Sequence, residues 1–401
     1  MISIILCTYN RAHTLKETID SILRQTYRDF ELIIVDDGST DNTLELLEEY
    51  KDERIRIFPQ KENQYYCIAA NYGIKQMRGQ YLAFATSDDT WEPQKLELQM
   101  EELTHKPECA ACFTFSDIIN EESRKANEEF EMLSGLLIKN YKTQREWVQH
   151  FIFEGNCLCH PSAVIRKEVI DEVGGFNLMY CQSGDMELWL RIVRKYPICV
   201  VERTLVHYRC YKNPLEQVSG ADEMKAARFF NEHMLIRRDF LRDLTAEELA
   251  EFFGDCFRKP DACTPPELEI ERAFLLMDCT HHLPGLRILG IEKLEELLHI
   301  PETLEVLKNS YGVDIHDVYE WNHEHFFMDF GVHVRLAEQE KELKELKENL
   351  TEQKLRLTVT EKNLQKKEQD LKEIEGLLNK AVLEKLKIEE GLSKRYRGKR
   401  R

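Results

Sequence analysis

Acidic and hydroxyl-bearing residues gather at three points in the first quarter of the sequence, each directly after a short apolar segment. The three clusters are Thr8-Tyr9-Asn10 after residues 2–7, Asp36-Asp37 after residues 31–35, and Ser87-Asp88-Asp89 after residues 81–85. Adjacent carboxylates offer the hard oxygen ligands that divalent cations take, and a bound cation recruits phosphate. These residue types therefore suit the binding of a phosphorylated ligand through a metal ion.

The apolar segments are predicted to be buried β-strands, because each is short, rich in β-branched residues and closed by turn-forming residues. A further strand is expected at residues 54–58, and helical patterns separate the strands, for example at residues 42–50 and 69–77. This alternation predicts an α/β fold with a mainly parallel sheet and helices on both faces. In such sheets ligands bind beyond the carboxyl ends of the strands, so we expect the three clusters to converge there.

Three motifs occur in order along this part of the chain, at Ser3–Arg11, Phe30–Thr43 and Gly79–Pro93. Together they closely resemble the family 2 glycosyltransferases of GT-A fold, over about residues 1–215. The resemblance implies a Rossmann-like sheet and an inverting glycosyltransferase, which moves a sugar from a UDP- or dTDP-sugar to a hydroxyl acceptor with Mn²⁺ or Mg²⁺. Family members build many surface polysaccharides and glycoconjugates, and the resemblance implies such a role here.

The resemblance also carries roles onto five residues. Tyr9, with Thr8 beside it, matches the residue whose ring packs on the nucleotide base, and a π-face suits any base. Asp37 matches the carboxylate that accepts an N–H group of the base. Asp88 and Asp89 match the family's metal motif, in which we expect Asp89 to bind the metal and Asp88 to reach the ribose or the metal's water shell.

Each of these assignments has a structural alternative. Tyr9 would then only fill the edge of the sheet, and the acids at 88–89 would cap a helix ahead of Glu92-Pro93. Asp36 is expected to orient its loop. Paired acids also mark phospho-acceptor receiver domains, but there the pair follows the first strand, whereas here it follows the second. Thr86 stands where many relatives carry another acid, which leaves the metal geometry open.

An inverting transfer also needs a general base to take the proton from the acceptor hydroxyl. In the family this base is an Asp just ahead of an aromatic-rich helix, after a Gly-Gly-Phe turn. The sequence has Gly174-Gly175-Phe176 followed by Asp185, so the resemblance assigns the base to Asp185. Gly184 stands where relatives usually carry Glu, which implies a looser loop or a different acceptor. Asp185 could instead, or in addition, cap the helix that carries Trp189.

Cysteine and histidine give weaker metal candidates. Cys157, Cys159 and His160 lie close together before the Gly-Gly-Phe turn, and Cys109 and Cys112 precede an apolar strand. Neither group has a second ligand pair at reliable zinc spacing, so buried thiols are the simpler interpretation. The twelve cysteines form no compact framework and are expected to be reduced, as in a cytoplasmic protein.

The charge of the chain is unevenly distributed. From Leu336 onward there are 18 basic and 14 acidic residues, which leaves 37 basic against 59 acidic residues before it. Such an acidic body argues against a nucleic-acid partner, which would need a basic face. No stretch approaches the ~20 apolar residues that a membrane span requires.

Three regions are expected along the chain. Residues 1–220 would form the GT-A domain, closed by a late strand at His207-Tyr208-Arg209, whose histidine is a further candidate ligand. Residues 221–331 would form a helical accessory region. Residues 332–401 would form a coiled coil with a basic tail, because leucine recurs every seven residues from Leu336 to Leu378.

The coiled coil is expected to join copies of the chain into a homo-oligomer, although its companion positions are half polar. A solvated single helix or a disordered tail is the alternative. The tail has six basic residues among its last eight. They could hold the enzyme at the inner face of the membrane, near anionic lipid and a lipid-linked saccharide acceptor, at ~1 kcal/mol per basic residue; a solvated terminus explains the same residues.

Other classes of protein fit less well. A sugar nucleotidyltransferase would need a glycine-rich phosphate loop after the first strand, and a dinucleotide-dependent oxidoreductase would need Gly-x-Gly-x-x-Gly there. The chain has neither motif at this place, because its sequence there is Cys7-Thr8-Tyr9-Asn10-Arg11-Ala12. The main alternative is a catalytically inactive, transferase-like scaffold that oligomerises through its coiled coil.

Overall fold

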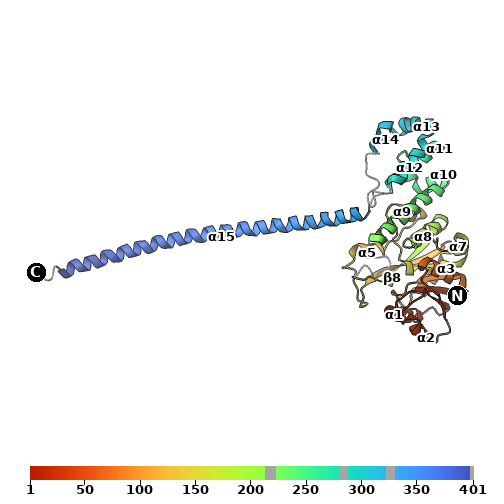
Figure 1. The fold of residues 1–401 in the computed structure, drawn as a ribbon, viewed down its shortest axis with the longest axis horizontal. Coiled ribbons are helices and arrows are strands. Elements are labelled where there is room, and N and C mark those ends of the chain that lie inside the picture. The colour runs from red at the N-terminus through yellow and green to blue at the C-terminus, as the bar shows by residue number, and fades with distance from the viewer. Residues whose placement is uncertain (213–222, 280–286, 322–329, 398–401) are drawn as a thin grey trace. The chain divides into compact units, whose positions relative to one another are not determined.

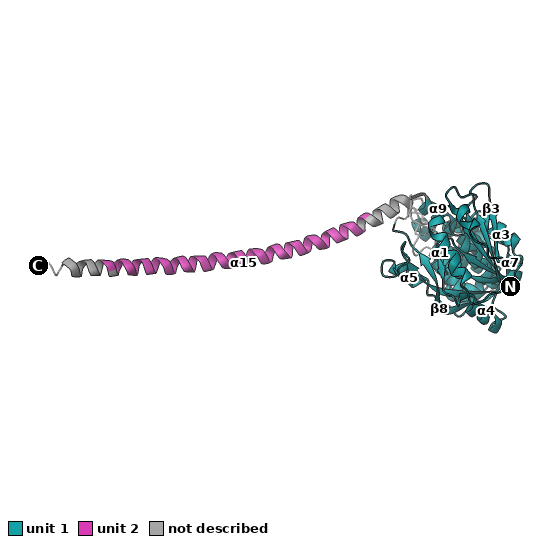
Figure 2. Ribbon diagram, turned by 90° about the horizontal axis from the view of Figure 1, so that it is seen from below, with its two compact units in different colours: residues 1–330 teal, residues 331–401 magenta. Residues whose placement is uncertain are grey.

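The computed structural model describes residues 1–212, 223–279, 287–321 and 330–397. The chain divides into two compact units, residues 1–330 and residues 331–401 (Figure 2). The first unit is built on a β-sheet surrounded by helices (Figure 1), and the second is a long helix.

A mixed sheet of eight strands forms the centre of the first unit, in the order β3-β2-β1-β4-β7-β6-β8-β5. The strands are β1 (Ile2–Thr8), β2 (Phe30–Asp36), β3 (Ile55–Pro59), β4 (Tyr81–Ala85), β5 (Thr90–Trp91), β6 (Ala111–Ile119), β7 (Val164–Arg166) and β8 (Ile198–Arg209). The strands β3, β2, β1 and β4 lie side by side in that order and are parallel, and β6 is parallel to β8. The strands β7 and β5 run antiparallel to their neighbours. The four strands predicted from the sequence are confirmed to within one residue at each end.

Parallel pairing brings the carboxyl ends of β1, β2 and β4 to one edge of the sheet. Thr8 lies opposite Asp36 across the first pair, and Leu6 lies opposite Ala85 across the second. Every residue of β1 and β2 is buried, as expected for strands covered on both faces. The polar residues that follow these strands therefore meet at the same edge, as the sequence predicts.

Helices cover both faces of the sheet. Ile5 and Val35 point into one core, which they share with α3, α6 and α8, while Ile4 and Ile34 point into the other, which they share with α1 and α4. The helices up to this point are α1 (Ala12–Leu23), α2 (Thr43–Glu48), α3 (Tyr66–Gln76), α4 (Lys95–His105), α5 (Glu131–Leu136), α6 (Gln144–Phe153), α7 (Lys167–Val173) and α8 (Gly184–Lys195), with a 3₁₀ helix at His160–Ser162. The predicted α/β fold, with helices on both faces of a largely parallel sheet, is confirmed.

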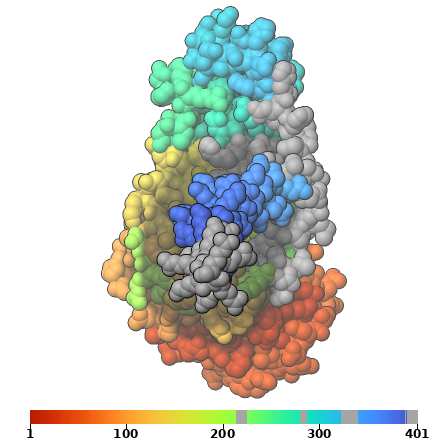
Figure 3. All heavy atoms as spheres, turned by 90° about the vertical axis from the view of Figure 1, so that its left-hand side faces the viewer, coloured from red at the N-terminus to blue at the C-terminus, as the bar shows by residue number. Residues whose placement is uncertain are grey.

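A run of helices follows the sheet within the first unit. They are α9 (Glu223–Asp243), α10 (Ala246–Phe253), α11 (Pro265–Asp278), α12 (Ile288–Leu298), α13 (Pro301–Val306) and α14 (Ile315–Trp321). Ile236 and Leu241 of α9 and Phe252 of α10 belong to the same core as α8 and the sheet. The helices α9 and α10 therefore pack directly on the helices that cover the sheet. Figure 3 shows the N-terminal residues (red to orange) and α11–α13 (cyan) at opposite ends of the first unit.

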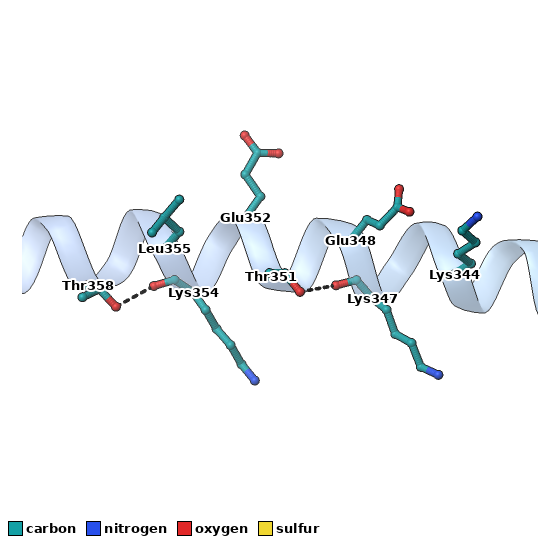
Figure 4. Close-up of a pocket in the computed structure, with 8 residues that line it drawn as sticks. All are labelled: Lys344, Lys347, Glu348, Thr351, Glu352, Lys354, Leu355 and Thr358. Atoms are coloured by element: carbon teal, nitrogen blue, oxygen red, sulfur yellow. Dashed lines mark hydrogen bonds between the residues drawn. The ribbon is translucent and has the colours of Figure 1, made fainter.

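The second unit is α15 (Phe330–Arg397), a helix of 68 residues. Its described side chains are exposed, including those of the leucines at the predicted heptad positions from Leu343 onward. The hollow drawn in Figure 4 lies along this helix, and all eight residues that line it, from Lys344 to Thr358, come from α15. It is therefore a groove on an exposed helix surface rather than an enclosed site. The end of the basic tail, residues 398–401, lies outside the described residues.

No helix among the described residues is both long enough and apolar enough to cross a lipid bilayer.

Candidate functional site

The loop after β1 is fixed against the loop after β2. Asn10 has a left-handed backbone conformation, with φ of 52°, which Asn tolerates better than most residues. Its Oδ1 accepts the N–H of Thr40 at 2.7 Å, and its own N–H donates to Ser39 Oγ at 2.9 Å. Tyr9 stands between this anchor and the end of β1 with 41% of its surface exposed. Its ring is therefore accessible to a ligand at this edge.

Thr8 and Asp36, which end β1 and β2, each carry a buried polar atom without a partner. Among the described residues, neither Thr8 Oγ1 nor Asp36 Oδ1 makes a hydrogen bond. The other oxygen of Asp36 accepts the N–H of Ser39 at 3.1 Å, which ties the loop to the strand. Buried polar atoms without partners cost free energy. These two atoms thus mark a place where a polar ligand group would be favourable.

Asp37 is buried beside them and faces the loop between β3 and α3. Its N–H donates to the carbonyl of Thr8 at 2.8 Å, and its two carboxylate oxygens accept the N–H of Gln64 at 3.0 and 3.1 Å. Burial raises the pKa of Asp37, although the backbone N–H groups of Gln64 and Tyr65 oppose the shift. Gly38 follows with φ of +76°, and a Cβ there would lie 2.7 Å from the backbone of Glu62, so the turn requires glycine.

Asp88 and Asp89 follow β4 and contact the last residues of the sheet. Asp89 Oδ1 accepts the backbone N–H of Arg209 at 2.7 Å, and its Oδ2 accepts the hydroxyl of Thr86. Asp88 Oδ2 accepts the hydroxyl of Tyr211 at 3.3 Å. Burial raises the pKa of both carboxyl groups, and the neighbouring charge of Asp88 raises that of Asp89 further. Two carboxyl groups with raised pKa values thus lie next to each other, Asp89 buried and Asp88 half-buried.

The chemistry of this pair fits a divalent cation, which would relieve both the repulsion and the cost of burial. Each oxygen of Asp89 accepts one hydrogen bond and keeps a second lone pair for a metal. In the part of the chain that the structure describes, no group of three or more His, Cys, Asp or Glu side chains is assembled around a common point. A cation held by this pair would need further ligands from outside the chain, such as water.

Asp185 lies in the first turn of α8, which begins at Gly184 after the N-cap residue Ser183. It therefore stands inside the helix rather than at its cap. Asp185 Oδ1 accepts the N–H of Met186 at 2.7 Å, and Oδ2 accepts Asn156 Nδ2 at 2.9 Å. Burial raises the pKa of Asp185 to about 6. A carboxylate with this pKa suits a general base working near neutral pH.

The turn at Gly174-Gly175-Phe176 is clamped from two sides. Asn71 of α3 accepts the N–H of Phe176 at 2.8 Å and donates to its carbonyl at 2.8 Å. Arg191 of α8 donates to the carbonyl of Gly175 at 2.7 Å and also to those of Val173 and Gly174. A Cβ at Gly175 would lie 2.2 Å from Asn71 Oδ1, so this close approach depends on glycine. The motif thus joins α3 to the helix that carries Asp185.

Cys159 interacts electrostatically with Asp89 of the acidic pair and with Asp185. Burial raises the pKa of the Cys159 thiol well above its usual range, and the charges of Asp89 and Asp185 add to the shift. Both carboxylates therefore act on one buried thiol, although 96 positions separate them in the sequence. The order β2-β1-β4 places Asp37 at the same edge of the sheet.

Three contributors were not predicted from the sequence. Arg209 is buried, and its guanidinium donates to the carbonyl of Asp88 at 2.8 Å and to Glu17 at 2.7 Å. Tyr211 contacts Asp88, and Asn156 contacts Asp185. Arg209 stands 120 positions after Asp89, so no local pattern could have paired them.

The weaker metal candidates have other surroundings. His160 is packed among aromatic side chains and bonds to the hydroxyl of Tyr66, and burial lowers its pKa to about 3. His207 lies on β8 and pairs with Asp117 and Glu92. Cys109 is a buried free thiol. None of these contacts brings His160, His207 or Cys109 to Asp88 or Asp89.

Comparison with solved structures gives loose likenesses of fold. The *Staphylococcus aureus* protein TarS, residues 1–349 in complex with UDP, matches with a TM-score of 0.48 and 18% identity, covering 77% of this chain and 91% of that one. A mannosyltransferase from *Pyrobaculum calidifontis*, PcManGT, in complex with GDP-Man and Mn²⁺, matches with a TM-score of 0.46 and 14% identity, covering 84% and 86%. At these scores the likeness supports no conclusion about function.

Sequence comparison gives closer relatives. An uncharacterized glycosyltransferase of *Rickettsia conorii* is 32% identical over 256 residues, which are 63% of this chain but only 40% of that protein. The putative teichuronic acid biosynthesis glycosyltransferase TuaG of *Bacillus subtilis* is 28% identical over 57% of this chain and 84% of its own length. The *Escherichia coli* protein WfgD, a UDP-Glc:alpha-D-GlcNAc-diphosphoundecaprenol beta-1,3-glucosyltransferase, is 36% identical over 55% of this chain and 79% of its own length.

The family model for "Glycosyl transferase family 2" matches residues 3–174, which contain the three strand-end clusters and the start of the Gly-Gly-Phe turn. This match and the extended identity with WfgD agree with the geometry at the sheet edge. The chain therefore belongs to the family 2 glycosyltransferases.

Proposed function

We propose that this glycosyltransferase takes its sugar from a nucleotide diphosphate sugar, a UDP- or dTDP-sugar, and passes it to a hydroxyl acceptor with inversion at the anomeric carbon. The observation that carries the proposal is the convergence of the carboxyl ends of β1, β2 and β4 at one edge of the sheet, where the acids at 88–89 follow β4. Asp185 supports it, because its charge and that of Asp89 act on the same buried thiol of Cys159. A single displacement needs a base on one side of the reacting carbon and a site for the leaving diphosphate on the other.

The donor would bind at the edge formed by β1, β2 and β4. Tyr9 offers an exposed ring for the base, and Asp37 a carboxylate for a base N–H. The partnerless Thr8 Oγ1 is available to a polar group of the nucleotide. Asp88 would reach the ribose or the water around the metal. In the names of relatives, UDP-Glc is the donor of WfgD, which supports a UDP-sugar here.

Asp89, with Asp88 beside it, would hold Mn²⁺ or Mg²⁺. Such a cation, when bound, neutralises the charge that develops on the departing nucleoside diphosphate. Arg209 and Thr86 hold the Asp89 carboxylate by a hydrogen bond to each oxygen, which fixes the orientation of its remaining lone pairs.

Asp185 would take the proton of the acceptor hydroxyl as its oxygen attacks the anomeric carbon. Asn156 donates to Oδ2 of Asp185 and the N–H of Met186 donates to Oδ1, so the carboxylate is held in place while each oxygen keeps a second lone pair for the proton. The pKa of about 6 leaves most of the group ionised at neutral pH and still basic enough to accept a proton.

The acceptor is proposed to be a saccharide, free or lipid-linked, within surface polysaccharide or glycoconjugate synthesis. The names of WfgD, with its diphosphoundecaprenol-linked acceptor, and of TuaG, in teichuronic acid biosynthesis, support this. A lipid-linked acceptor would suit a protein working at the inner face of the membrane.

We also propose that α15 pairs with the same helix of a second copy. Its leucines at every seventh position, among them Leu343, Leu350, Leu357 and Leu364, are 51–60% exposed. A leucine stripe of this length is self-complementary, because each leucine of one copy can pack against its equivalent in another.

The test is a donor screen with the purified full chain. UDP-, dTDP- and GDP-sugars are offered with Mn²⁺ or EDTA, and released nucleoside diphosphate is measured. We expect one donor to be consumed, with release lost in EDTA and in Asp89→Ala. Glu45→Ala, which removes an exposed acid of α2, is the control and should keep metal-dependent release.

Absence of release and of nucleotide binding under every condition would contradict the proposal and favour the inactive scaffold. Undiminished release in EDTA and in Asp89→Ala would leave a transferase but remove the metal from its mechanism.

A further inference from the structure

Helix α9 carries a buried carboxylate aimed at the loop that leads to Asp185. Glu232 is 4% exposed and accepts three consecutive backbone N–H groups, those of Cys181 at 2.7 Å, Gln182 at 2.9 Å and Ser183 at 2.7 Å. Hydrogen bonds from backbone N–H groups to an ionised carboxylate are among the stronger ones in proteins. One side chain thus fixes three residues in a row.

The loop that Glu232 holds sets the start of α8. Ser183 is the N-cap residue, Gly184 begins the helix, and Asp185 follows at once. The neighbouring positions leave little room for adjustment, because a Cβ at Gly184 would lie 3.0 Å from Cys67 Sγ. A shift of the loop would therefore turn the first turn of α8 and move the Asp185 carboxylate with it.

The same helix also supports the partner of Asp185. Arg237, which is 2% exposed, donates from Nε to the carbonyl of Ile152 at 2.7 Å, at the end of α6. Gly155 follows with φ of +108°, and a Cβ there would meet His233 Cε1 at 3.6 Å. Asn156, the next residue, donates to Asp185 Oδ2. One face of α9 thus contacts both segments that meet at Asp185.

We propose that Glu232 and Arg237 of α9 are positioning residues, which hold Asp185 and Asn156 in the arrangement in which Asp185 takes the acceptor's proton. The helix lies beyond the segment 3–174 that the family model matches. In this chain the active site therefore includes the first helix after residue 222. The inference rests on the role proposed for Asp185 and adds residues from outside the sheet region.

The pH profile of the rate distinguishes a positioning role for Glu232 from a purely structural one, which would leave the profile unchanged. Among the described residues, the titratable groups that interact electrostatically with Asp185 are Glu232 from α9, the phenol of Tyr66 and the thiol of Cys67 from α3, and the thiol of Cys159. Burial raises the pKa of the phenol and both thiols, so they stay neutral, and the carboxylate of Glu232 contributes the negative charge that helps to raise the pKa of Asp185. Removal of that charge should move the acid limb of the rate profile to lower pH.

The experiment compares full-length wild type with Glu232→Gln, Glu232→Ala and Asp239→Asn. Gln keeps an acceptor oxygen for the loop but removes the charge. Asp239 is seven residues further along the same helix and contacts Arg238 and Arg242, so its variant is the matched control. The readouts are hydrogen–deuterium exchange of the amides at 181–183, kcat and donor KM, the pH profile, and Tm.

We expect faster exchange at 181–183 in Glu232→Ala and a kcat lower by about tenfold to a hundredfold, the cost of a misplaced catalytic group. Donor KM should change by less than about twofold, since the donor edge is built from other elements. Glu232→Gln should lose less kcat and shift the acid limb to lower pH. Asp239→Asn should match wild type in every readout.

The inference is overturned if the Glu232 variants keep wild-type kcat, or if they lose activity only in proportion to unfolded protein with an unchanged pH profile. These outcomes are distinct from failure of the proposed function. If wild type consumes no donor, the transferase mechanism fails and the positioning role fails with it, while an active wild type with unaffected variants removes the positioning role alone.

Discussion

At the scale of single residues, the proposed mechanism needs two carboxylates whose surroundings differ. Asp89 and Asp185 each accept one hydrogen bond on each oxygen, but Asp89 also has an acidic neighbour, Asp88, whereas Asp185 is bonded to Asn156 and to the next N–H of its own helix. Paired acids suit a cation ligand, and a single carboxylate suits a group that must gain and lose a proton. Asp89 is buried, whereas Asp185 is half-buried.

Asp185→Asn should remove the base and leave the donor edge intact. We expect kcat to fall on the order of 10²- to 10⁴-fold, the usual contribution of general base catalysis, with little change in donor affinity. Steady-state kinetics and nucleotide titration measure the two effects separately. Asp171→Asn, at an exposed acid of α7 paired with Lys167, serves as the control. Normal transfer by the Asp185 variant would remove this residue from the mechanism.

The pH dependence follows from the same group. Burial raises the pKa of Asp185 to about 6, and the base works only when it is ionised. The rate should therefore be at its plateau above about pH 7 and fall as the pH drops through 6, with one proton taken up. A kcat profile that stays level down to pH 5 would show that no group with this pKa is needed.

The acids at the strand ends could be located from the sequence because each follows an apolar segment of characteristic composition, whereas Asp185 was assigned through the family resemblance. Asp37, Asp88 and Asp89 needed only the strand pattern and the rule that ligands gather at strand ends. Arg209, Asn156 and Glu232 could not be found this way. The residues that they bond to are 120, 29 and about 50 positions away in the sequence, respectively. Nothing in the sequence around Arg209, Asn156 or Glu232 indicates these partners.

At the scale of elements, the parallel half of the sheet was predictable and the rest was not. β1 to β4 alternate with helices, so each strand is bounded by its own local pattern. β7 has three residues and β5 has two, and both depend on pairing with strands far away in the sequence. Short strands of this kind leave no periodic signal. The late strand ending at Arg209 was expected, but not its pairing with β6.

The Gly-Gly-Phe turn gives a test of how α3 and α8 are joined. Gly175→Ala places a Cβ within 2.2 Å of Asn71 Oδ1 and must displace the side chain that clamps Phe176. We expect a loss of ~1–3 kcal/mol in the free energy of unfolding, as for overpacking elsewhere. Chemical denaturation measures it.

The control for this variant is Gly135→Ala in α5, where a Cβ would meet nothing within 4 Å. There alanine should leave stability unchanged or raise it, because glycine is a poor helix former. Equal stability of wild type and Gly175→Ala would mean that the clamp does not hold the turn.

At the scale of the whole molecule, two helical additions follow the family's sheet. The first, from α9 onward, shares a core with α8 and contacts the loops around Asp185. The second, α15, is a separate unit whose described side chains are exposed. Its heptads were evident in the sequence because a repeat of seven is a local signal. The contacts of α9 were not evident, because its sequence shows only an ordinary helix.

The pairing of α15 can be tested in the full chain by point variants. Leu357→Lys together with Leu364→Lys places charge in the middle of the leucine stripe, whereas Leu355→Lys lies on the opposite side of the helix. Sedimentation should give wild type and the Leu355 variant a multiple of the 47.5 kDa chain mass, and the double variant the mass of a single chain. A monomeric wild type at micromolar concentration would contradict the proposed pairing.

The measurement that tests the central claim most directly is the anomeric configuration of the product. With the donor identified by the screen and a saccharide acceptor that receives its sugar, proton NMR of the purified product reports the configuration of the new linkage. The account predicts the opposite configuration to that of the donor, formed by wild type and not by Asp185→Asn. A product with the donor's own configuration would contradict single displacement with Asp185 as the base.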